Sequence, residues 1–223
     1  MKNKKNLLEQ LKPLTHFSKD SLCQLGKQLG IADTTVDTYI SRFLKYKEIL
    51  SLKNGLYVSS DFFRSHRNDI SYFYYLANII RTPSYVSSWS ALQFYNLATE
   101  TIHSITSVTP KITRNYDTKT GNYTYQTIKE SLFSDFFLMS KDPAFPASTT
   151  LLAKKSSFEF DFFIASPSKA LFDLLYFKTR QFRGIKSKDI KILIEELRID
   201  IDEMDKKEQA KFYAITQKHI HNE

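Results

Sequence analysis

The sequence has little cysteine, little glycine and no long apolar run. Its single cysteine, Cys23, excludes an internal disulfide framework and a zinc site built from several cysteines, which fits a reducing compartment. The 5 glycines form no phosphate-cradling cluster, so nucleotide hydrolysis has no support. No apolar run approaches the roughly 18 residues of a membrane helix, and none follows the charged N-terminus as in a signal peptide. We therefore expect a cytoplasmic protein with no membrane partner and no cofactor.

What the sequence does contain is typical of a folded globular protein. The chain has 223 residues, enough for one large domain or two small ones. Hydrophobic residues make up 42% and charged residues 25%, and 18 phenylalanines and 13 tyrosines supply large side chains for a core. This composition excludes a disordered or low-complexity chain.

Positive charge is concentrated in the first quarter of the chain. Lysine and arginine number 32 against 24 acidic residues, which gives a net charge of +8. Residues 1–60 hold 10 basic and 5 acidic side chains, a net of +5, and the remaining residues hold 22 and 19, a net of +3. Such a balance favours a polyanionic partner that binds this first quarter.

The first sixty residues predict three short helices. Three leucines at helical spacing precede Pro13, which cannot continue a helix. Ser18 is a typical N-cap for a second helix, which should end at Gly30. After a tight turn, a third helix should start at Asp33 or Thr34.

The third helix is expected to be amphipathic. Val36, Ile40, Phe43 and Leu44 fall within an arc of roughly 100° and should face the core. The opposite arc carries short hydroxyls and cations, which can approach a duplex closely and contact base edges or phosphates. We assign DNA binding to Thr34, Thr35, Thr38, Ser41, Arg42 and Lys45.

A hairpin is predicted directly after the third helix. The segment ILSLKNGLYVSS has two β-prone runs joined by Asn54-Gly55, a pair suited to a tight turn. Helices followed by a hairpin are typical of a winged helix-turn-helix, in which Lys53 and Asn54 would lie at the wing tip, within reach of the DNA. A small protein-interaction module with the same elements is the alternative.

The remaining chain predicts an α+β domain. Residues 61–82 have the pattern of one connecting helix ending at Pro83, and a strand, a cap at Ser87 and a helix should follow. Four stretches have β-strand patterns: 104–109, 122–128, 134–139 and 158–164. Further helices are expected from Pro167, at 187–197 and at 202–218. The predicted fold is thus α+β, with a winged helix-turn-helix at 1–60, a connecting helix at 61–82 and a mixed α/β domain at 83–223.

Catalytic or metal-binding chemistry has little support. Glu159 and Asp161 lie two apart on an expected strand, with Asp135 and Lys169 nearby in the sequence, as in some metal-dependent nucleases. Such a site needs an acid and a lysine two residues apart on the same strand, but Phe163 follows Asp161 at that distance. The five histidines are scattered and lack companion ligands, so we expect no metal site and no enzyme.

A second basic stretch lies near the C-terminal end of the helix that begins at Pro167. It is interpreted either as a solvated surface or as a secondary DNA surface. Its residues are Lys178, Arg180, Arg183, Lys186 and Lys188.

Three segments together resemble a known family. Residues 77–92 read ANIIRTPSYVSSWSAL, 105–109 read ITSVT and 167–177 read PSKALFDLLYF. This series resembles the AbiEi family of type IV antitoxins over most of the chain. The chain departs from the family at Tyr95-Asn96, where His-Gly is usual, and at Ser168, where Glu is common. The pattern is met at Pro83, Ser84, Tyr85, Ser87, Ala91, Leu92, Leu97, Glu100, Thr106, Val108, Thr109, Pro167, Lys169, Ala170, Leu171, Asp173 and Leu174.

The resemblance implies two activities in an abortive-infection operon that defends against phage. The N-terminal domain would repress its own operon by binding inverted repeats in double-stranded operator DNA, as a monomer or weak dimer. The C-terminal domain would neutralise a nucleotidyltransferase toxin without a stable complex. The alternative is a stand-alone transcriptional regulator whose second domain senses a ligand or partner.

Overall fold

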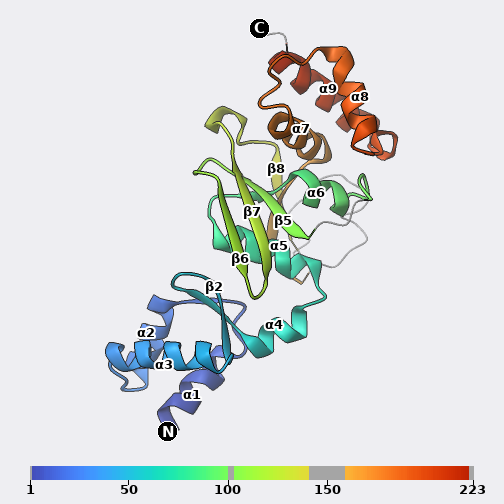
Figure 1. The fold of residues 1–223 in the computed structure, drawn as a ribbon. Coiled ribbons are helices and arrows are strands. Elements are labelled where there is room, and N and C mark those ends of the chain that lie inside the picture. Colours follow the sequence, from blue (N-terminus) through green and yellow to red (C-terminus); the bar gives the residue numbers. More distant parts are fainter. Residues whose placement is uncertain (1, 100–102, 141–158, 221–223) are drawn as a thin grey trace. The chain divides into compact units, whose positions relative to one another are not determined.

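The protein is an α+β chain that divides into two compact units (Figure 1). The computed structural model describes residues 2–99, 103–140 and 159–220. The first unit extends to Tyr72 and includes Tyr116–Asn122, and the second contains Phe73–Asn115 and the chain from Tyr123 onwards. None of the helices in these described ranges has the length and apolar character needed to cross a membrane.

The first unit contains the three helices and the hairpin expected in residues 1–60. Its sheet has the order β1-β3-β2, and both pairings are antiparallel. The elements are α1 (Lys2–Leu11), β1 (Phe17–Ser18), α2 (Lys19–Gln28), α3 (Asp33–Lys45), β2 (Ile49–Lys53), β3 (Leu56–Ser59) and α4 (Ser60–His66).

Local signals set the ends of α2. Ser18 is its N-cap, and the side-chain oxygen accepts a hydrogen bond from the backbone N–H of Ser21 at 3.0 Å. Gly30 follows the helix at φ +67°, a left-handed conformation that a glycine adopts without steric cost. The predicted start and end of this helix are confirmed.

The core of the first unit joins α1, α2, α3 and the small sheet. Helix α3 contributes residues at i, i+4 and i+7, as an amphipathic helix should. The buried residues of this core are Leu7, Leu11, Phe17, Leu22, Ile31, Val36, Ile40, Phe43, Ile49 and Tyr57.

The second unit is built on a mixed sheet of order β6-β7-β5-β4-β9-β8. Strand β4 pairs parallel to β9 and antiparallel to β5, while β8 pairs antiparallel to β9. Its elements are α5 (Ile70–Ile80, which begins in the first unit), β4 (Tyr85–Val86), α6 (Ser88–Phe94), β5 (Ser104–Thr109), β6 (Arg114–Thr118), β7 (Gly121–Thr127), a 3₁₀ turn (Glu130–Leu132), β8 (Phe136–Met139), β9 (Phe162–Ala165), α7 (Pro167–Lys178), α8 (Ser187–Glu196), a 3₁₀ turn (Ile201–Glu203) and α9 (Lys206–Ile220). The end of β6 and the start of β7 fall within Tyr116–Asn122 and so belong to the first unit.

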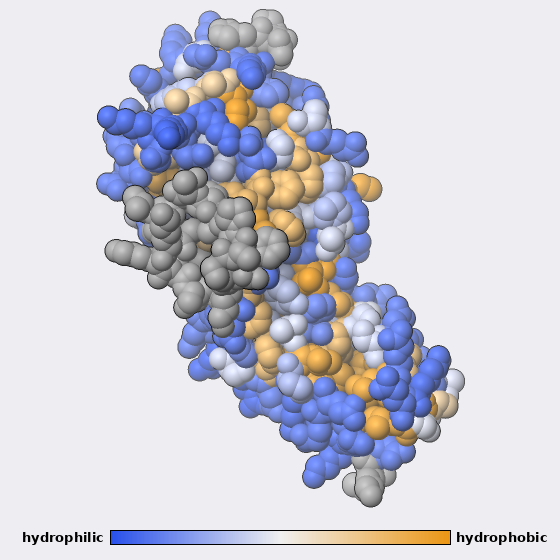
Figure 2. Space-filling model, turned by 180° about the vertical axis from the view of Figure 1, so that it is seen from behind, coloured by the Kyte–Doolittle hydropathy of each residue, from blue (hydrophilic) through white to orange (hydrophobic). Residues whose placement is uncertain are grey.

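Helix α7 is the central helix of the second unit. Each of its first ten residues, Pro167 to Tyr176, is buried, including the polar Ser168, Lys169 and Asp173. Both α6 and α9 pack against it. On the face seen in Figure 2, hydrophilic residues cover much of the described surface of each unit, with hydrophobic residues visible between them.

Several predicted elements differ from those observed. Residues 61–82 form two helices, α4 and α5, because Asp69 accepts the backbone N–H of Ser71 at 2.8 Å and so caps a new helix. Strand β9 begins at Phe162, so Glu159 and Asp161 precede it, and residue 158 lies outside the described residues.

Strand β6 is not predicted from the sequence, because its residues RNYDT have no alternating apolar pattern. The strand lies at the edge of the sheet, and its side chains are exposed or half-buried. The last helix, predicted at 202–218, begins at Lys206 after a short 3₁₀ turn.

Candidate functional site

The polar face of α3 is exposed, as predicted. Val36, Ile40 and Phe43 anchor the helix in the core of the first unit. On the opposite side Thr34, Thr38, Ser41, Arg42 and Lys45 are exposed, and Thr35 is half-buried. The structure thus brings the six predicted residues of this helix onto one solvent-facing surface.

The hydroxyls of this face donate to the helix itself. Thr38 Oγ1 donates to the carbonyl of Thr34 at 3.1 Å, and Ser41 Oγ donates to the carbonyl of Asp37 at 3.0 Å. Since a hydroxyl has one proton and two lone pairs, these side chains present acceptors to a molecule that approaches the face.

Arg42 and Lys45 are the cationic residues of the same face. They lie in the last turn of α3, where positive charge interacts favourably with the helix dipole. Neither forms an ion pair within the described ranges of the chain, whereas Lys4, Lys12, Lys19 and Lys27 each do. Their charges are therefore not neutralised by neighbouring carboxylates.

Two acids at the edge of this face were not singled out from the sequence. Asp37 forms an ion pair with Lys19 at 2.8 Å, and Asp33 forms one with Lys27 at 3.4 Å. Both pairs connect α2 to α3. The available signal was the charge along α3, which carries two acids near its start and two cations near its end.

The hairpin turn is anchored beside the start of α2. The backbone N–H of Lys19 donates to the carbonyl of Gly55 at 2.9 Å, directly beyond the pairing of Ser18 with Leu56. Asn54 is exposed at the turn, but Lys53 is only half-exposed and lies at an irregularity of the β2–β3 register. The predicted residues are thus at the turn, and the hairpin is short.

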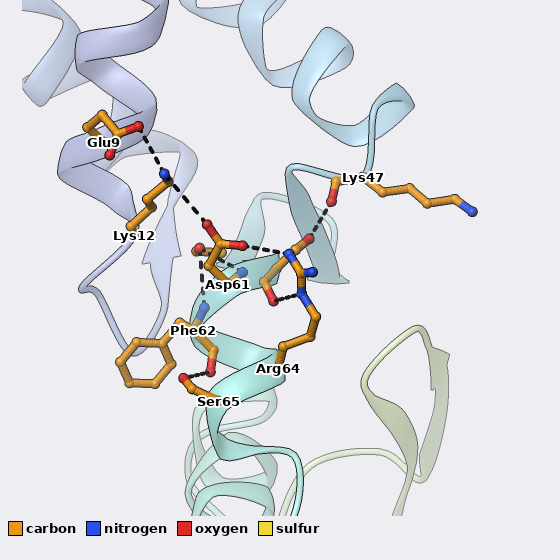
Figure 3. A network of polar contacts seen from close by, with 9 residues as sticks. Glu9, Lys12, Lys47, Asp61, Phe62, Arg64 and Ser65 are labelled. Atoms are coloured by element: carbon orange, nitrogen blue, oxygen red, sulfur yellow. Dashed lines mark hydrogen bonds and ion pairs between the residues drawn. The ribbon is translucent and has the colours of Figure 1, made fainter.

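A polar network fixes the chain around the end of α3 (Figure 3). Lys12, directly after α1, pairs with Glu9 at 2.9 Å and with Asp61 on α4 at 3.6 Å. The hydrogen bond from Lys12 to Glu9 raises the pKa of the lysine.

The same network reaches the turn after α3. Ser60 Oγ, at the start of α4, donates to the carbonyl of Lys47 at 2.5 Å, while the Lys47 side chain extends away from the network (Figure 3). Arg64 pairs with Asp61 at 2.6 Å and also donates to the carbonyl of Ser60. These contacts hold α1, α4 and the end of α3 together.

The second basic stretch is also exposed. A tight turn after α7 places Arg180, Gln181 and Phe182 at positive φ, and the buried Phe182 ring packs against Phe172 and Tyr176. This anchored turn and the start of α8 present five exposed cations, with no ion pair among the described residues. They are Lys178, Arg180, Arg183, Lys186 and Lys188.

A buried polar cluster connects α7 to β4. Asp173 accepts from Lys169 Nζ at 2.5 Å, from Ser87 Oγ at 2.7 Å and from Tyr85 Oη at 3.1 Å. Burial raises the pKa of Asp173 and also that of Tyr85. Ser87 is the N-cap residue of α6, as predicted, but its hydroxyl donates to Asp173 and makes no capping hydrogen bond with the helix.

The candidate nuclease residues do not assemble. Lys169 is buried with Asp173, whereas Asp135 pairs with Lys211 at 3.0 Å and Asp161 is exposed. Among the described residues, no group of three histidine, cysteine or acidic side chains has the geometry to hold a metal ion. Burial lowers the pKa of His16, and His221 lies outside the described residues.

The residues that carry the family resemblance lie mostly in the interior of the second unit. Tyr85, Ser87, Lys169 and Asp173 form the buried cluster, and Thr106 joins β5 to this segment by donating to the carbonyl of Ser87 at 2.7 Å. Glu100 lies outside the described residues. No protein-family model matches the chain, and no curated protein matches it.

Proposed function

We propose that residues 1–60 form a winged helix-turn-helix in which α3 enters the major groove of double-stranded operator DNA. The observation that carries this proposal is the exposed face of α3, where Arg42 and Lys45 have no carboxylate partner in the described ranges. Such cations bind phosphates or the acceptor atoms of guanine. The network around Ser60 and Lys47 supports this role, because it holds the end of α3 in place.

The hairpin would act as a short wing. Asn54 is exposed at its turn and has the reach to contact the sugar–phosphate backbone, with Lys53 beside it. The five cations after α7 would add a second DNA surface, and a solvated surface remains the alternative interpretation. The salt dependence of DNA binding separates the two, since each phosphate contact adds about 0.9 to the slope of log affinity against log salt concentration.

We further propose that the chain is a cytoplasmic, non-enzymatic antitoxin of the AbiEi type. It would repress its own operon at inverted repeats, as a monomer or weak dimer, and neutralise a nucleotidyltransferase toxin without a stable complex. The support is the resemblance in residues 77–92, 105–109 and 167–177. Four residues of the first and third segments, Tyr85, Ser87, Lys169 and Asp173, form one buried cluster.

Replacing Arg42 and Lys45 together with alanine is expected to weaken operator binding several-fold. The loss of one or two phosphate contacts should also reduce the salt slope by about 0.9 to 1.8. Gel-shift titration of the full chain at several salt concentrations measures both quantities, and circular dichroism checks that the fold is retained.

The matched control replaces Lys5 and Arg67 with alanine. These two exposed cations belong to the same unit, so the control removes the same charge from a surface outside α3. Equal affinities of the R42A/K45A and K5A/R67A proteins would refute the assignment of α3 as the recognition helix.

Co-expression separates the two proposed activities. Together with a nucleotidyltransferase encoded next to this gene, the full chain should relieve growth arrest, and the R42A/K45A variant should do so equally well because neutralisation is assigned to the second unit. Failure of the wild-type chain to relieve arrest, or absence of such a neighbouring gene, would favour the stand-alone transcriptional regulator.

A further inference from the structure

An ion pair lies at the edge of the α3 surface. Lys19, the first residue of α2, places its Nζ 2.8 Å from Asp37 Oδ1 and 3.0 Å from Oδ2. The Asp37 side chain is 52% exposed, so solvent or a ligand can reach it. Ser41, one turn further along the helix, donates to the Asp37 carbonyl. The carboxylate therefore borders the surface assigned to DNA without being buried.

In the proposed complex, the Asp37 carboxylate would oppose the binding of DNA in general. Helix α3 carries Asp33 and Asp37 in its first half and Arg42 and Lys45 in its second half, which leaves it with no net charge. A carboxylate beside a phosphate backbone is repelled, and its pairing with Lys19 also occupies a cation that is otherwise available to phosphates. Asp37 thus weakens binding to every sequence unless a base compensates for its charge.

Only a base that donates a hydrogen bond in the major groove can compensate for the charge of Asp37. In the major groove, cytosine presents the N4 amino group as a donor, and aspartate is a natural acceptor for it. Adenine presents the N6 amino group beside the N7 acceptor, which suits an amide better than a carboxylate. The neighbouring Thr38 and Ser41 hydroxyls donate to the helix backbone, so this end of the surface is rich in acceptors. Arg42 and Lys45 offer only donors at the other end.

We propose that Asp37, held by Lys19, is a specificity-determining residue of α3 that accepts a hydrogen bond from the amino group of a cytosine and repels DNA without that donor. This inference rests on the proposed function, because it requires α3 to enter the major groove. Such a residue gives specificity because it repels the wrong DNA sequences as well as attracting the right one.

The test is the variant D37N, compared with wild type in selection from a library of random-sequence duplexes. An amide pairs with adenine where a carboxylate accepts from cytosine, so the selected base at one position should change from cytosine to adenine. Affinity for the wild-type selected duplex should fall by about tenfold. Affinity for unselected DNA should rise, with a salt slope steeper by about 0.9, because Lys19 is released to bind a phosphate.

The matched control is D20N, which removes an exposed acid of α2 in the same unit. It should raise affinity for both kinds of DNA alike and leave the selected sequence unchanged. Identical selected sequences for wild type and D37N, with R42A/K45A still deficient, would overturn the role of Asp37 alone. Failure of the wild type to bind or enrich any duplex would overturn the proposed function together with this inference.

Discussion

Replacing Lys169 with methionine is expected to lower the free energy of unfolding by about 3–5 kcal/mol. Lys169 Nζ lies 2.5 Å from Asp173 Oδ1, and the two side chains are 3% and 0% exposed. Methionine keeps much of the apolar stem but removes the ammonium group, so the Asp173 carboxylate is left in the interior without a cation. Urea unfolding at neutral pH, followed by circular dichroism, measures the loss.

The loss should depend on pH in a definite direction. Burial raises the pKa of Asp173, and Lys169 is the largest influence that lowers it, so the variant raises that pKa further. A carboxyl group whose native pKa lies above its unfolded value favours folding when protonated, and that advantage is lost as the pH rises through the native pKa. The K169M protein should therefore be closest to wild type in mildly acidic buffer. A loss of equal size at every pH would contradict this account.

A second substitution tests whether the isolated charge is the cause. In K169M/D173N the amide oxygen still accepts from Tyr85 and Ser87, which are the other donors to Asp173, but no charge is buried. The double variant should recover most of the stability that K169M loses at neutral pH. If it is as unstable as the single variant, the loss arises from packing and not from electrostatics.

The first unit was largely predictable because its signals are local. The cap at Ser18, the positive φ at Gly30 and the turn at Asn54-Gly55 are each specified by residues within a few positions of one another. The exposed face of α3 follows from helical periodicity in the same way. The ion pair of Lys19 with Asp37 spans 18 positions and depends on how α2 packs against α3, so no local pattern predicted it.

For the second unit, the sequence predicts the α+β fold class but not the partners of its buried polar side chains. The predicted helix from Pro167 is confirmed. The sequence associates Lys169 with the acids of a strand, but its partner is Asp173, four residues away on the same helix. Lysine and aspartate at i and i+4 within an apolar helix are a recognisable signal for a buried pair. The hydrogen bonds from Tyr85 and Ser87 to Asp173 span 88 and 86 positions, and only the three-dimensional fold brings these segments together.

Replacing Gly26 with alanine is expected to destabilise the protein, although alanine favours helix by about 1 kcal/mol over glycine. Gly26 is buried in α2, and a Cβ atom there would lie 2.6 Å from Val36 Cγ2 on α3. The valine side chain is short and stiff at χ1, so it cannot move aside without shifting α3, the helix that carries the proposed DNA-binding face. Overpacking of this kind costs about 1–3 kcal/mol. We expect a net loss of stability, measured by urea unfolding, and weaker operator binding.

In a V36A background, Gly26→Ala is expected to stabilise the protein instead of destabilising it. Val36→Ala alone should cost about 2 kcal/mol through the cavity it leaves in the core. It also removes the Cγ2 atom that a Cβ at position 26 would meet, so Gly26→Ala in that background should gain the helical preference of alanine without a clash. The same substitution is thus expected to destabilise the wild type and stabilise V36A. Equal effects in the two backgrounds would mean that contact between α2 and α3 at this point does not limit their packing, and that the position of the α3 surface is set elsewhere.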